Sequence, residues 1–279
     1  MTGLGAVTYV DAPDIAIGDV LGSSVFNIFI LAILDAFYHP VPISSKAHHG
    51  HIISASFGVI IFSITITSII FKEYVPSFAW IGIYSIVFII LYLIAIRLVY
   101  FYEKRQISKF IKEISIELKY ENISTHSAVT KYAINAIIII LAAVLLPKIG
   151  KDIAESSKLG QTFVGNVFIA LSTSLPELVV SISAIKMGAV DLAIGNIFGS
   201  NLFNMFILAI DDIFFLRGPI LSSANLHHII SATSSIIMTC IAIIGLTYRQ
   251  ENKSLLLSWD SIMIVLMYMI NVILLYWLT

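Results

Sequence analysis

The sequence has 279 residues, of which 58% are hydrophobic and only 12% are charged. Soluble domains average about 25% charged residues, so this composition excludes an ordinary soluble enzyme and a disordered chain. The 16 Lys and Arg residues do not exceed the 17 Asp and Glu residues, which argues against nucleic acid as a partner. Cys240 is the one cysteine, and no Cys or His spacing suggests a zinc or haem site. The composition therefore indicates a polytopic membrane protein.

Eight apolar runs are long enough to cross a membrane. About 20 residues of helix span the hydrocarbon core, whereas a barrel strand needs only about 9–11 residues. The runs therefore predict helices, and we expect an all-α membrane protein. The expected spans are 14–36, 52–71, 78–101, 127–147, 161–187, 190–216, 226–246 and 255–278.

A polar segment at 102–126 separates the third and fourth spans. It carries five Lys or Arg residues. Basic residues in short loops mark the cytoplasmic side of a membrane protein. We therefore expect this segment to be a cytoplasmic linker in a protein of the cell membrane. The next loop, with Lys148, Lys151 and Lys158, then lies outside.

The chain contains an internal repeat with an offset of 177 residues. Segments 14–35 and 191–212 are identical at 14 of 22 positions. They are the first and sixth predicted spans, so they cross the membrane in opposite senses, as inverted repeats do. We expect a first repeat at 1–101, the linker at 102–126 and a second repeat at 127–279.

The most informative segment is 165–188, in the fifth span. Pro176 removes a backbone donor and frees the carbonyl of Ser172, which must then be satisfied inside the protein or by a bound species. Glu177 is an acid near the middle of the span, where a charge costs roughly 2.5–3.5 kcal/mol. Thr173 lies one turn before Glu177 on the same face. We expect a functional site around Glu177.

Polar stripes continue this site into two other spans. The stripes recur every fourth residue, as Asp19, Ser23 and Asn27 in the first span and as Asn196, Ser200 and Asn204 in the sixth. Beside them, the pairs Gly18–Gly22 and Gly195–Gly199 allow close helix packing. All candidate ligands are oxygen atoms, which suit hard cations such as Na⁺, Ca²⁺ or Mg²⁺ rather than zinc or copper. We expect an oxygen-lined cation site near the midplane.

This two-part pattern resembles the alpha repeats of the sodium/calcium exchanger family, the cation/calcium antiporters. The family pairs a Thr-Ser-x-Pro-Glu break with a following Gly-Asn-x-x-Gly-Ser-Asn helix. This chain reads TSLPE at 173–177 and GNIFGSN at 195–201, and the resemblance extends over nearly its whole length. It implies an inverted-repeat fold of ten helices, with about eight complete in this chain. It also implies exchange of Na⁺ for Ca²⁺ by alternating access.

The resemblance also implies a ligand set. The family's ion ligands fall on Ala170 (through its backbone oxygen), Thr173, Ser174, Glu177, Ser200, Asn204, Ser23 and Asn27, with Asp19, Asn196 and Ser172 as further candidates. Transported Na⁺ and Ca²⁺ and the lipid bilayer are the expected partners, with no cofactor. The sequence does not decide whether the chain self-associates.

The chain departs from the family pattern at three places. The first repeat has no Pro-Glu; counting 27 residues back from Asn27 gives the position just before Met1. We therefore expect a fragment or a misassigned start, with a protein that borrows its second carboxylate from another chain as the alternative. Asn204 stands where many members have Asp. Asp19 replaces the usual Asn, and it either adds an acid to the site or lies at the helix start by the interface.

Two other functions remain open on the sequence alone. One is cation/proton exchange, with Glu177 cycling its proton. The other is a truncated paralogue that binds cations without transporting them. An enzyme has the least support because no nucleophile–base pair is evident.

Acids and histidines at the span ends have a simpler interpretation. Asp14 and Asp191 begin their spans and are predicted to be helix N-caps. His51 and His228 are related by the offset of 177, and we expect interface or loop roles for them, with pH sensing as the alternative.

Overall fold

The computed structural model describes all residues except 1, 39, 111–124, 254 and 279. Within the described residues, eight helical segments are long and apolar enough to cross a membrane, one for each predicted span, which confirms an all-α membrane protein. They are α2 (Pro13–Phe37), α4 (Gly50–Ile70), α5 (Ile83–Phe110), α6 (Thr125–Ser157), the span Gln161–Lys186, α9 (Val190–Phe214), α10 (His228–Tyr248) and α11 (Trp259–Trp277).

The span Gln161–Lys186 has three parts. These are α7 (Gln161–Val164), a π-helical turn η3 (Gly165–Ile169) and α8 (Ala170–Lys186). We call it the α7–α8 span. Single π-helical turns inside helices are often found at functional sites.

Short elements connect the long helices. The short helix α1 (Thr2–Gly5) and the π-helical η1 (Ala6–Val10) precede α2, and α3 (Ile43–Lys46) joins α2 to α4. The 3₁₀ turn η2 (Lys72–Tyr74) and an antiparallel hairpin, β1 (Ser77–Phe78) with β2 (Ile81–Gly82), lead into α5. The 3₁₀ turn η4 (Ile220–Ser223) lies between α9 and α10.

Three predicted boundaries are wrong. The third span starts at Ile83 rather than at 78, because the hairpin occupies the first positions. Helix α5 continues to Phe110, inside the segment predicted as a loop, whose residues 111–124 lie outside the described residues. Helix α6 passes through Pro147 and ends at Ser157, although proline was expected to end it. A proline removes one hydrogen bond, and a long helix can retain its course around that loss.

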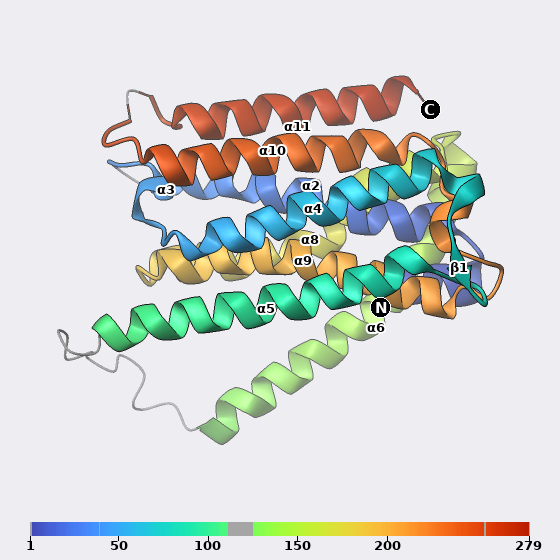
Figure 1. The fold of residues 1–279 in the computed structure, drawn as a ribbon, viewed down its shortest axis with the longest axis horizontal. Helices are drawn as coiled ribbons and strands as arrows, with labels where there is room; N and C mark the ends of the chain where they lie inside the picture. Colours follow the sequence, from blue (N-terminus) through green and yellow to red (C-terminus); the bar gives the residue numbers. More distant parts are fainter. Residues whose placement is uncertain (1, 39, 111–124, 254, 279) are drawn as a thin grey trace.

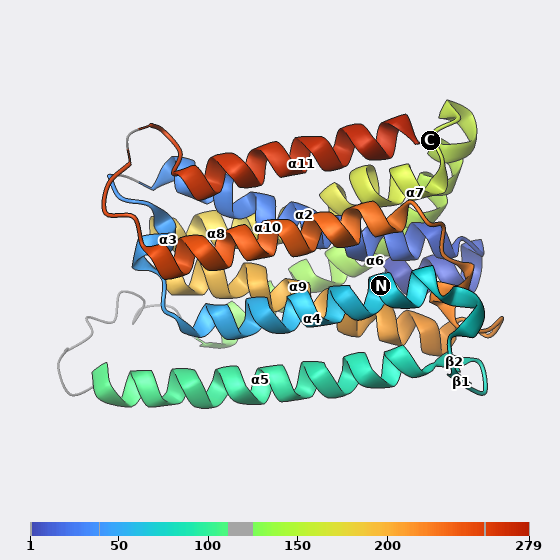
Figure 2. The same cartoon turned by 45° about the horizontal axis from the view of Figure 1, so that its top comes forward.

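The two copies of the repeat cross the bundle in opposite directions. Helix α2 starts at the right in Figure 1 and α9 starts at the left, and the two helices pack side by side. Figure 2 shows the same antiparallel arrangement from a second angle. We call the two ends of the bundle the Asp14 end, where α2 begins, and the Asp191 end, where α9 begins. The inverted repeat predicted from the sequence is therefore present.

Local backbone geometry also repeats with the offset of 177. Asp11 and Gly188, which precede the two repeated helices, both have positive φ angles, 53° and 77°. Each turn is followed by an alanine and then by the first residue of α2 or α9. The similar turn shows that the duplication preserves the backbone path as well as the side chains.

Buried carboxylates fix the loops that follow the repeated helices. Asp35 and Asp212 are fully buried and are related by the same offset. Asp35 accepts a hydrogen bond from Ile43 N at 2.9 Å, and Asp212 accepts one from Ile220 N at 2.6 Å. Their remaining donors are Ser258 N, Ser258 Oγ and Lys253 Nζ for Asp35, and Gly82 N, Tyr84 Oη and Ser85 Oγ for Asp212. These acids have structural roles because several donors satisfy each one.

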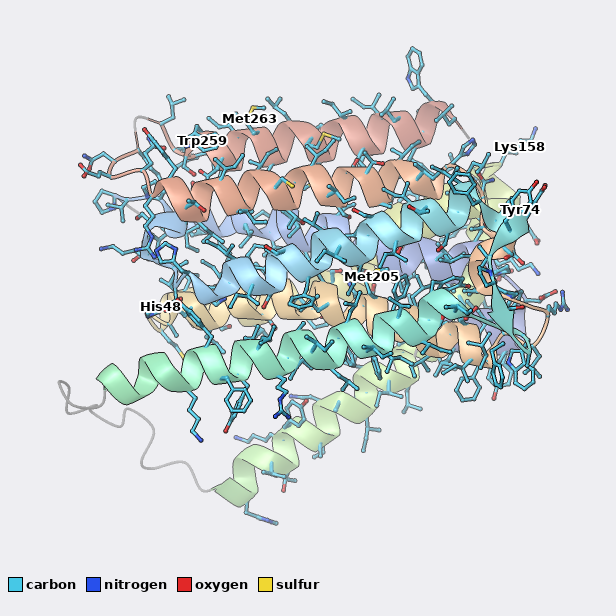
Figure 3. The ribbon with its side chains drawn as sticks, in the orientation of Figure 1. His48, Tyr74, Lys158, Met205, Trp259 and Met263 are labelled. Atoms are coloured by element: carbon cyan, nitrogen blue, oxygen red, sulfur yellow. The ribbon has the colours of Figure 1, made fainter. Side chains whose placement is uncertain are left out.

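The burial of the helices separates the centre of the bundle from its lipid-facing side. In α2, 78% of the most apolar window is buried, compared with 11% in α6. Figure 3 shows side chains standing out from the free faces of α5, α6 and α11, with His48 at one end of the bundle and Tyr74 and Lys158 at the other. Exposed apolar side chains along such helices suit contact with lipid. The structure therefore describes an integral membrane protein with α2 at its centre.

Replacing Asp212 with Ala should strongly destabilise the fold. The change leaves the donors at Gly82, Tyr84, Ser85 and Ile220 without their acceptor. Each buried unsatisfied donor costs about 1–3 kcal/mol, so the free energy of unfolding should fall by more than about 3 kcal/mol. Thermal unfolding in detergent measures the effect. Asp152→Ala, at an exposed position on α6, is the control, and equal melting temperatures for both variants would contradict the assignment.

Candidate cation site

Two glycines of α2 place this helix directly against the π-helical turn η3. A Cβ on Gly22 would lie 2.1 Å from the backbone oxygen of Asn166, and a Cβ on Gly18 would lie 3.0 Å from Asn166 N. Any larger residue would push the helices apart. The close approach brings the polar stripe of α2 next to the start of α8, as the glycine spacing predicted.

A cluster of oxygens forms where α2 meets α8. Thr173 Oγ1 donates to Asp19 Oδ1 at 2.6 Å and lies 3.0 Å from Ser23 Oγ. Ser23 Oγ also lies 3.3 Å from the Ala170 carbonyl oxygen and 3.4 Å from Asp19 Oδ1. Asp19 is therefore within the predicted site and not at a peripheral interface, which decides between the two interpretations left open by the sequence.

Glu177 lies between α8 and α9. Its Oε1 accepts a hydrogen bond from Ser200 Oγ at 3.4 Å, and its backbone oxygen accepts one from Asn196 Nδ2 at 3.3 Å. Asn196 Nδ2 also donates to Ser181 Oγ at 3.0 Å. Glu177 Oε2 is buried and has no hydrogen-bond partner among the described residues. One oxygen of the carboxylate is thus held by protein, and the other remains available to a ligand.

Amides connect α2 to α9 next to this site. Asn27 Nδ2 donates to Asn201 Oδ1 at 3.0 Å, and Asn201 Nδ2 donates to the Ser24 carbonyl at 3.1 Å. Asn204 Nδ2 reaches Ser24 Oγ at 3.4 Å. The Oδ1 atom of Asn27 is buried without a partner in the described part of the chain. Ser24 and Asn201 are related by the repeat offset, and that relation is the signal by which the sequence could have identified them.

Three details differ from the expected site. Ser172 is exposed, and its hydroxyl donates back to the Phe168 carbonyl at 2.8 Å, so this residue is not brought to the cluster. Helix α8 is continuous through Pro176, and the irregular turn is η3, which precedes it. Ser174 is buried on α8 beside Thr173. The expected break at the proline is therefore wrong, because a π-helical turn one to two turns earlier takes up the irregularity.

Asp211 is a buried acid that the sequence analysis did not single out. It is fully buried, and neither carboxylate oxygen has a hydrogen-bond partner among the described residues. Its carboxylate packs against Gly3, where a Cβ would lie 1.9 Å from Oδ2. The equivalent position in the first repeat is Leu34, so Asp211 departs from the internal symmetry.

The repeats are also joined at both ends by matched Asp–His contacts. Asp14 accepts from Asn225 N at 2.9 Å and contacts His228 Nε2 at 3.0 Å. Asp191 accepts from His48 N at 2.7 Å and contacts His51 Nε2 at 3.0 Å. The prediction that Asp14 and Asp191 are N-caps is wrong, because the cap positions are Ala12 and Ala189, without side-chain capping bonds. Each acid instead contacts the start of a helix from the other repeat.

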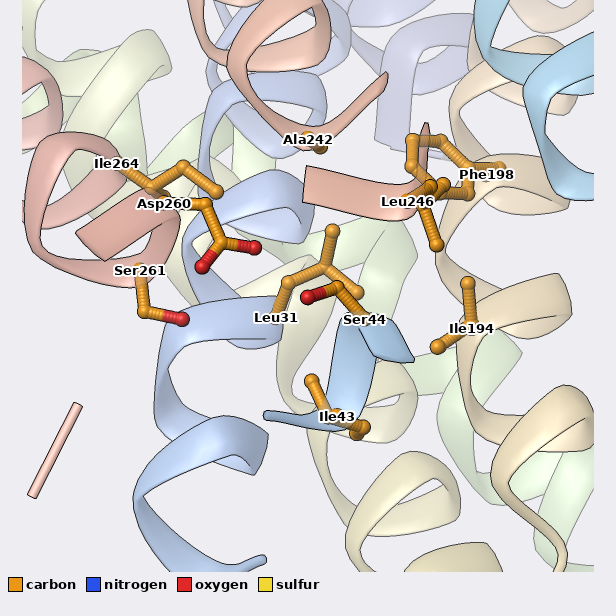
Figure 4. A pocket seen from close by; sticks show the side chains of 10 residues that line it. All are labelled: Leu31, Ile43, Ser44, Ile194, Phe198, Ala242, Leu246, Asp260, Ser261 and Ile264. Carbon is orange, nitrogen blue, oxygen red and sulfur yellow. The ribbon is translucent and has the colours of Figure 1, made fainter. Parts of the chain in front are cut away.

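A pocket elsewhere in the bundle is distinct from this cluster. Figure 4 shows it between α2, α3, α9, α10 and α11, with mostly apolar side chains and with Asp260, Ser261 and Ser44 at its edge. No predicted ion ligand lines it. The candidate cation site is therefore the cluster at the crossing of α2, α8 and α9.

The chemistry of this cluster suits a hard cation. It combines the carboxylates of Asp19 and Glu177 with hydroxyl, amide and backbone carbonyl oxygens. In the described part of the chain, no group of three His, Cys, Asp or Glu side chains could hold a metal ion. Mixed oxygen sets of this kind are typical of Na⁺ and Ca²⁺ sites.

An inverted repeat of membrane-spanning helices that surrounds buried oxygen atoms defines a secondary-transporter fold. The chain belongs to the sodium/calcium exchanger protein family, whose model matches residues 128–277. The family prediction made from the motifs is confirmed. Solved structures share the fold: the sodium-calcium exchanger NCX_Mj matches with 23% identity and a TM-score of 0.60 over 98% of this chain and 82% of that one. YfkE matches with 15% identity and a TM-score of 0.63 over 99% and 80%.

Relatives with similar sequences are also membrane proteins or exchangers by name. An uncharacterized membrane protein of Methanocaldococcus jannaschii is 27% identical over 199 residues, which cover 70% of this chain and 59% of that protein. The sodium/calcium exchanger MaX1 of Methanosarcina acetivorans is 31% identical over 126 residues, 45% of this chain and 34% of the relative. Inner membrane protein YrbG of Escherichia coli is 26% identical over 70% of this chain and 58% of its own length. The chain thus matches from one third to three fifths of these relatives' lengths.

Gly22→Ala should disturb the site, whereas Gly199→Ala should not. The two glycines are equivalent in the repeat, but a Cβ at Gly22 meets the Asn166 backbone at 2.1 Å, and a Cβ at Gly199 meets no described atom within 4 Å. Moving α2 away from η3 should lower the free energy of unfolding by about 1–3 kcal/mol. Thermal unfolding of the purified chain compares the two variants. An equal effect of both substitutions would contradict the packing described.

Proposed function

We propose that this chain is a secondary active antiporter, not an enzyme, that exchanges Na⁺ for Ca²⁺ across the membrane by alternating access. One observation carries the proposal: buried oxygens of Glu177 and Asn27, without described hydrogen-bond partners, belong to the oxygen cluster between the repeats. An unpaired buried polar group is costly in a membrane interior. A desolvated cation would supply the missing partner, and the transported ions are the only small molecules that the proposal requires.

Two carboxylates give the proposed site the charge that a divalent cation needs. Glu177 supplies one, and Asp19 supplies the other from the opposite repeat. They are close enough to interact electrostatically, and Thr173 lies between them, one turn before Glu177 and bonded to Asp19. Asp19 would thereby offset the absence of an acid at Asn204. Bringing two like charges together in a membrane is favourable when a cation binds between them.

The same oxygens would enforce exchange. Na⁺ and Ca²⁺ compete for one set of ligands, and the uncompensated carboxylates make the empty site costly to move through the membrane interior. Because α2 and α9 come from opposite repeats, rocking one repeat against the other would open the site first to one end and then to the other. Ion movement down one gradient would then drive the other ion against its own.

We place the protein in the cell membrane with segment 102–126 in the cytoplasm. Its five basic residues support this orientation. Helix α5 runs towards the Asp191 end, so that end faces the cytoplasm in the proposal and the Asp14 end faces outside. We retain 1–101 and 127–279 as the two repeats.

Glu177→Gln should abolish Na⁺-driven Ca²⁺ exchange. The substitution keeps the size of the side chain but removes its charge, and Ca²⁺ affinity should fall by on the order of 100-fold or more, since changes beyond the ligands alone cost about 10–100-fold. Flux of radioactive Ca²⁺ into Na⁺-loaded vesicles measures the effect. Glu155→Gln, at an exposed position of α6, is the control. Normal flux in Glu177→Gln would contradict the proposal, as would wild-type flux driven by a pH gradient and not by Na⁺.

Asp19→Asn should shift ion preference away from Ca²⁺. Asn keeps the oxygen that accepts from Thr173, so the hydrogen bond can persist while one negative charge is lost. A divalent cation loses more by this change than a monovalent one, and the half-saturating Ca²⁺ concentration should rise by about 10-fold or more with a smaller change for Na⁺. Competition of the two ions in the same flux assay gives both values. Equal changes for Na⁺ and Ca²⁺ would show that Asp19 does not act through its charge.

A further inference from the structure

A chain of three polar side chains leads from the Asp14 end into the bundle. The side chain of Asp14 is 26% exposed, whereas that of His228 is fully buried. His228 Nε2 lies 3.0 Å from Asp14 Oδ1, and His228 Nδ1 lies 3.1 Å from Asn166 Nδ2. This chain of contacts connects α2, α10 and the π-helical turn η3, and it uses none of the residues assigned to the cation site.

The contacts define the protonation state of the ring. Asn166 Nδ2 donates to the Thr162 carbonyl at 2.8 Å and points its second hydrogen towards His228. An amide nitrogen only donates, so His228 Nδ1 must accept. The neutral ring therefore carries its proton on Nε2 and donates it to Asp14.

Adding a second proton to His228 would conflict with this arrangement. The Nδ1–H group would then face the amide nitrogen of Asn166, which is another donor. Asn166 Oδ1 is buried and has no hydrogen-bond partner among the described residues, so rotation of the amide would offer it as the acceptor. That rotation breaks the bond from Asn166 to the Thr162 carbonyl. Protonation of one buried ring thus exchanges one hydrogen-bond arrangement for another.

A cavity gives protons access to this chain. It has a volume of about 340 Å³, is open to the surface and is lined by Asp14, Thr162, Asn225 and His227 among others. Asp14 lies on its wall and His228 lies behind Asp14. Water in a polar cavity of this size can deliver protons to the carboxylate.

The opposite end of the bundle does not repeat the whole chain. His51 contacts Asp191 in the same way, but its ring edge packs on Gly195, where a Cβ would lie 3.3 Å from Cε1. Among the described residues, only the contact chain at the Asp14 end continues to an amide of the α7–α8 span.

Asn166 is placed to transmit such a change to the cation site. Its backbone packs against Gly22, the neighbour of Ser23. Four residues further along the chain is Ala170, whose carbonyl lies within hydrogen-bond distance of both Ser23 Oγ and Thr173 Oγ1. A rearrangement of the Thr162–Asn166 turn would therefore move ligands of the proposed site.

We propose that Asp14, His228 and Asn166 form a proton-binding site, separate from the cation ligands, through which protons at the Asp14 end slow cation exchange. The transport readout of this inference rests on the proposed function. The other titratable groups that face this end of α10 are Lys72 and Glu73 after α4, Tyr276 on α11 and His227 beside the ring. Imidazole is the side chain that gains a proton near neutral pH, which makes His228 the group that titrates.

The first test is the pH dependence of exchange by the full chain in vesicles. Between about pH 8 and pH 5, wild-type exchange should fall by at least about fivefold, a size typical of coupling between two sites. His228→Gln should abolish this step, and His227→Gln, a matched change at the neighbouring ring outside the chain of contacts, should retain it. A step that persists in His228→Gln, or that is lost in His227→Gln, would overturn the proposal.

A second variant separates charge from structure. Asp14→Asn keeps the oxygen that accepts from Asn225 N but removes the negative charge beside the ring. Loss of a neighbouring carboxylate disfavours the charged ring, so the acid step should move to lower pH. An unchanged midpoint would overturn the assignment of Asp14 to the site.

Nuclear magnetic resonance of ¹⁵N-histidine-labelled chain in lipid nanodiscs tests the proton site without transport. The His228 signals, identified by their loss in His228→Gln, should show the Nε2–H form at high pH and gain a proton at Nδ1 on acidification. The Nδ1–H form at high pH would overturn the inference. Absence of exchange at every pH would overturn the proposed function alone, whereas normal titration with exchange that does not depend on pH would overturn the coupling.

Discussion

Lipid offers no hydrogen-bond partner, and this constraint sorts the buried polar groups of the structure by role. Asp35 and Asp212 are surrounded by donors from loops and neighbouring helices, so they hold the fold together. Glu177 and Asn27 each keep a buried oxygen without a described partner. The first pair needs nothing further, whereas the second pair is stable in a membrane interior only when something else compensates it.

The duplicated scaffold is symmetric in its framework but not in its centre. The turns before α2 and α9, the loop-fixing acids and the Asp–His contacts at the two ends all obey the offset of 177 residues. The glycines of the two helices do not, because Gly22 packs against η3 and Gly199 meets no described neighbour within 4 Å. Repetition therefore explains the architecture, while the α7–α8 span gives the central site its individual contacts.

The position of Asp19 shows how one substitution can change the character of a site. An acid on α2 reaches the start of α8 because two glycines bring the helices together, and it binds the hydroxyl of Thr173. In the proposed exchanger it supplies the charge that Asn204 lacks. The same close contact of α2 with η3 would connect the proposed proton site to the ligands, so both proposals depend on the packing at Gly22.

The sequence by itself determined the spans, their opposite directions and most of the residues in the oxygen cluster, because apolar length, the repeat offset and fourfold polar spacing are local properties of the chain. It could not place Asp19, whose role depends on how closely α2 approaches α8. It also misassigned Asp14 and Asp191 as helix caps and expected a break at Pro176. These outcomes were decided by the tertiary structure, since each depends on partners more than a hundred residues away or on how a helix redistributes a lost hydrogen bond.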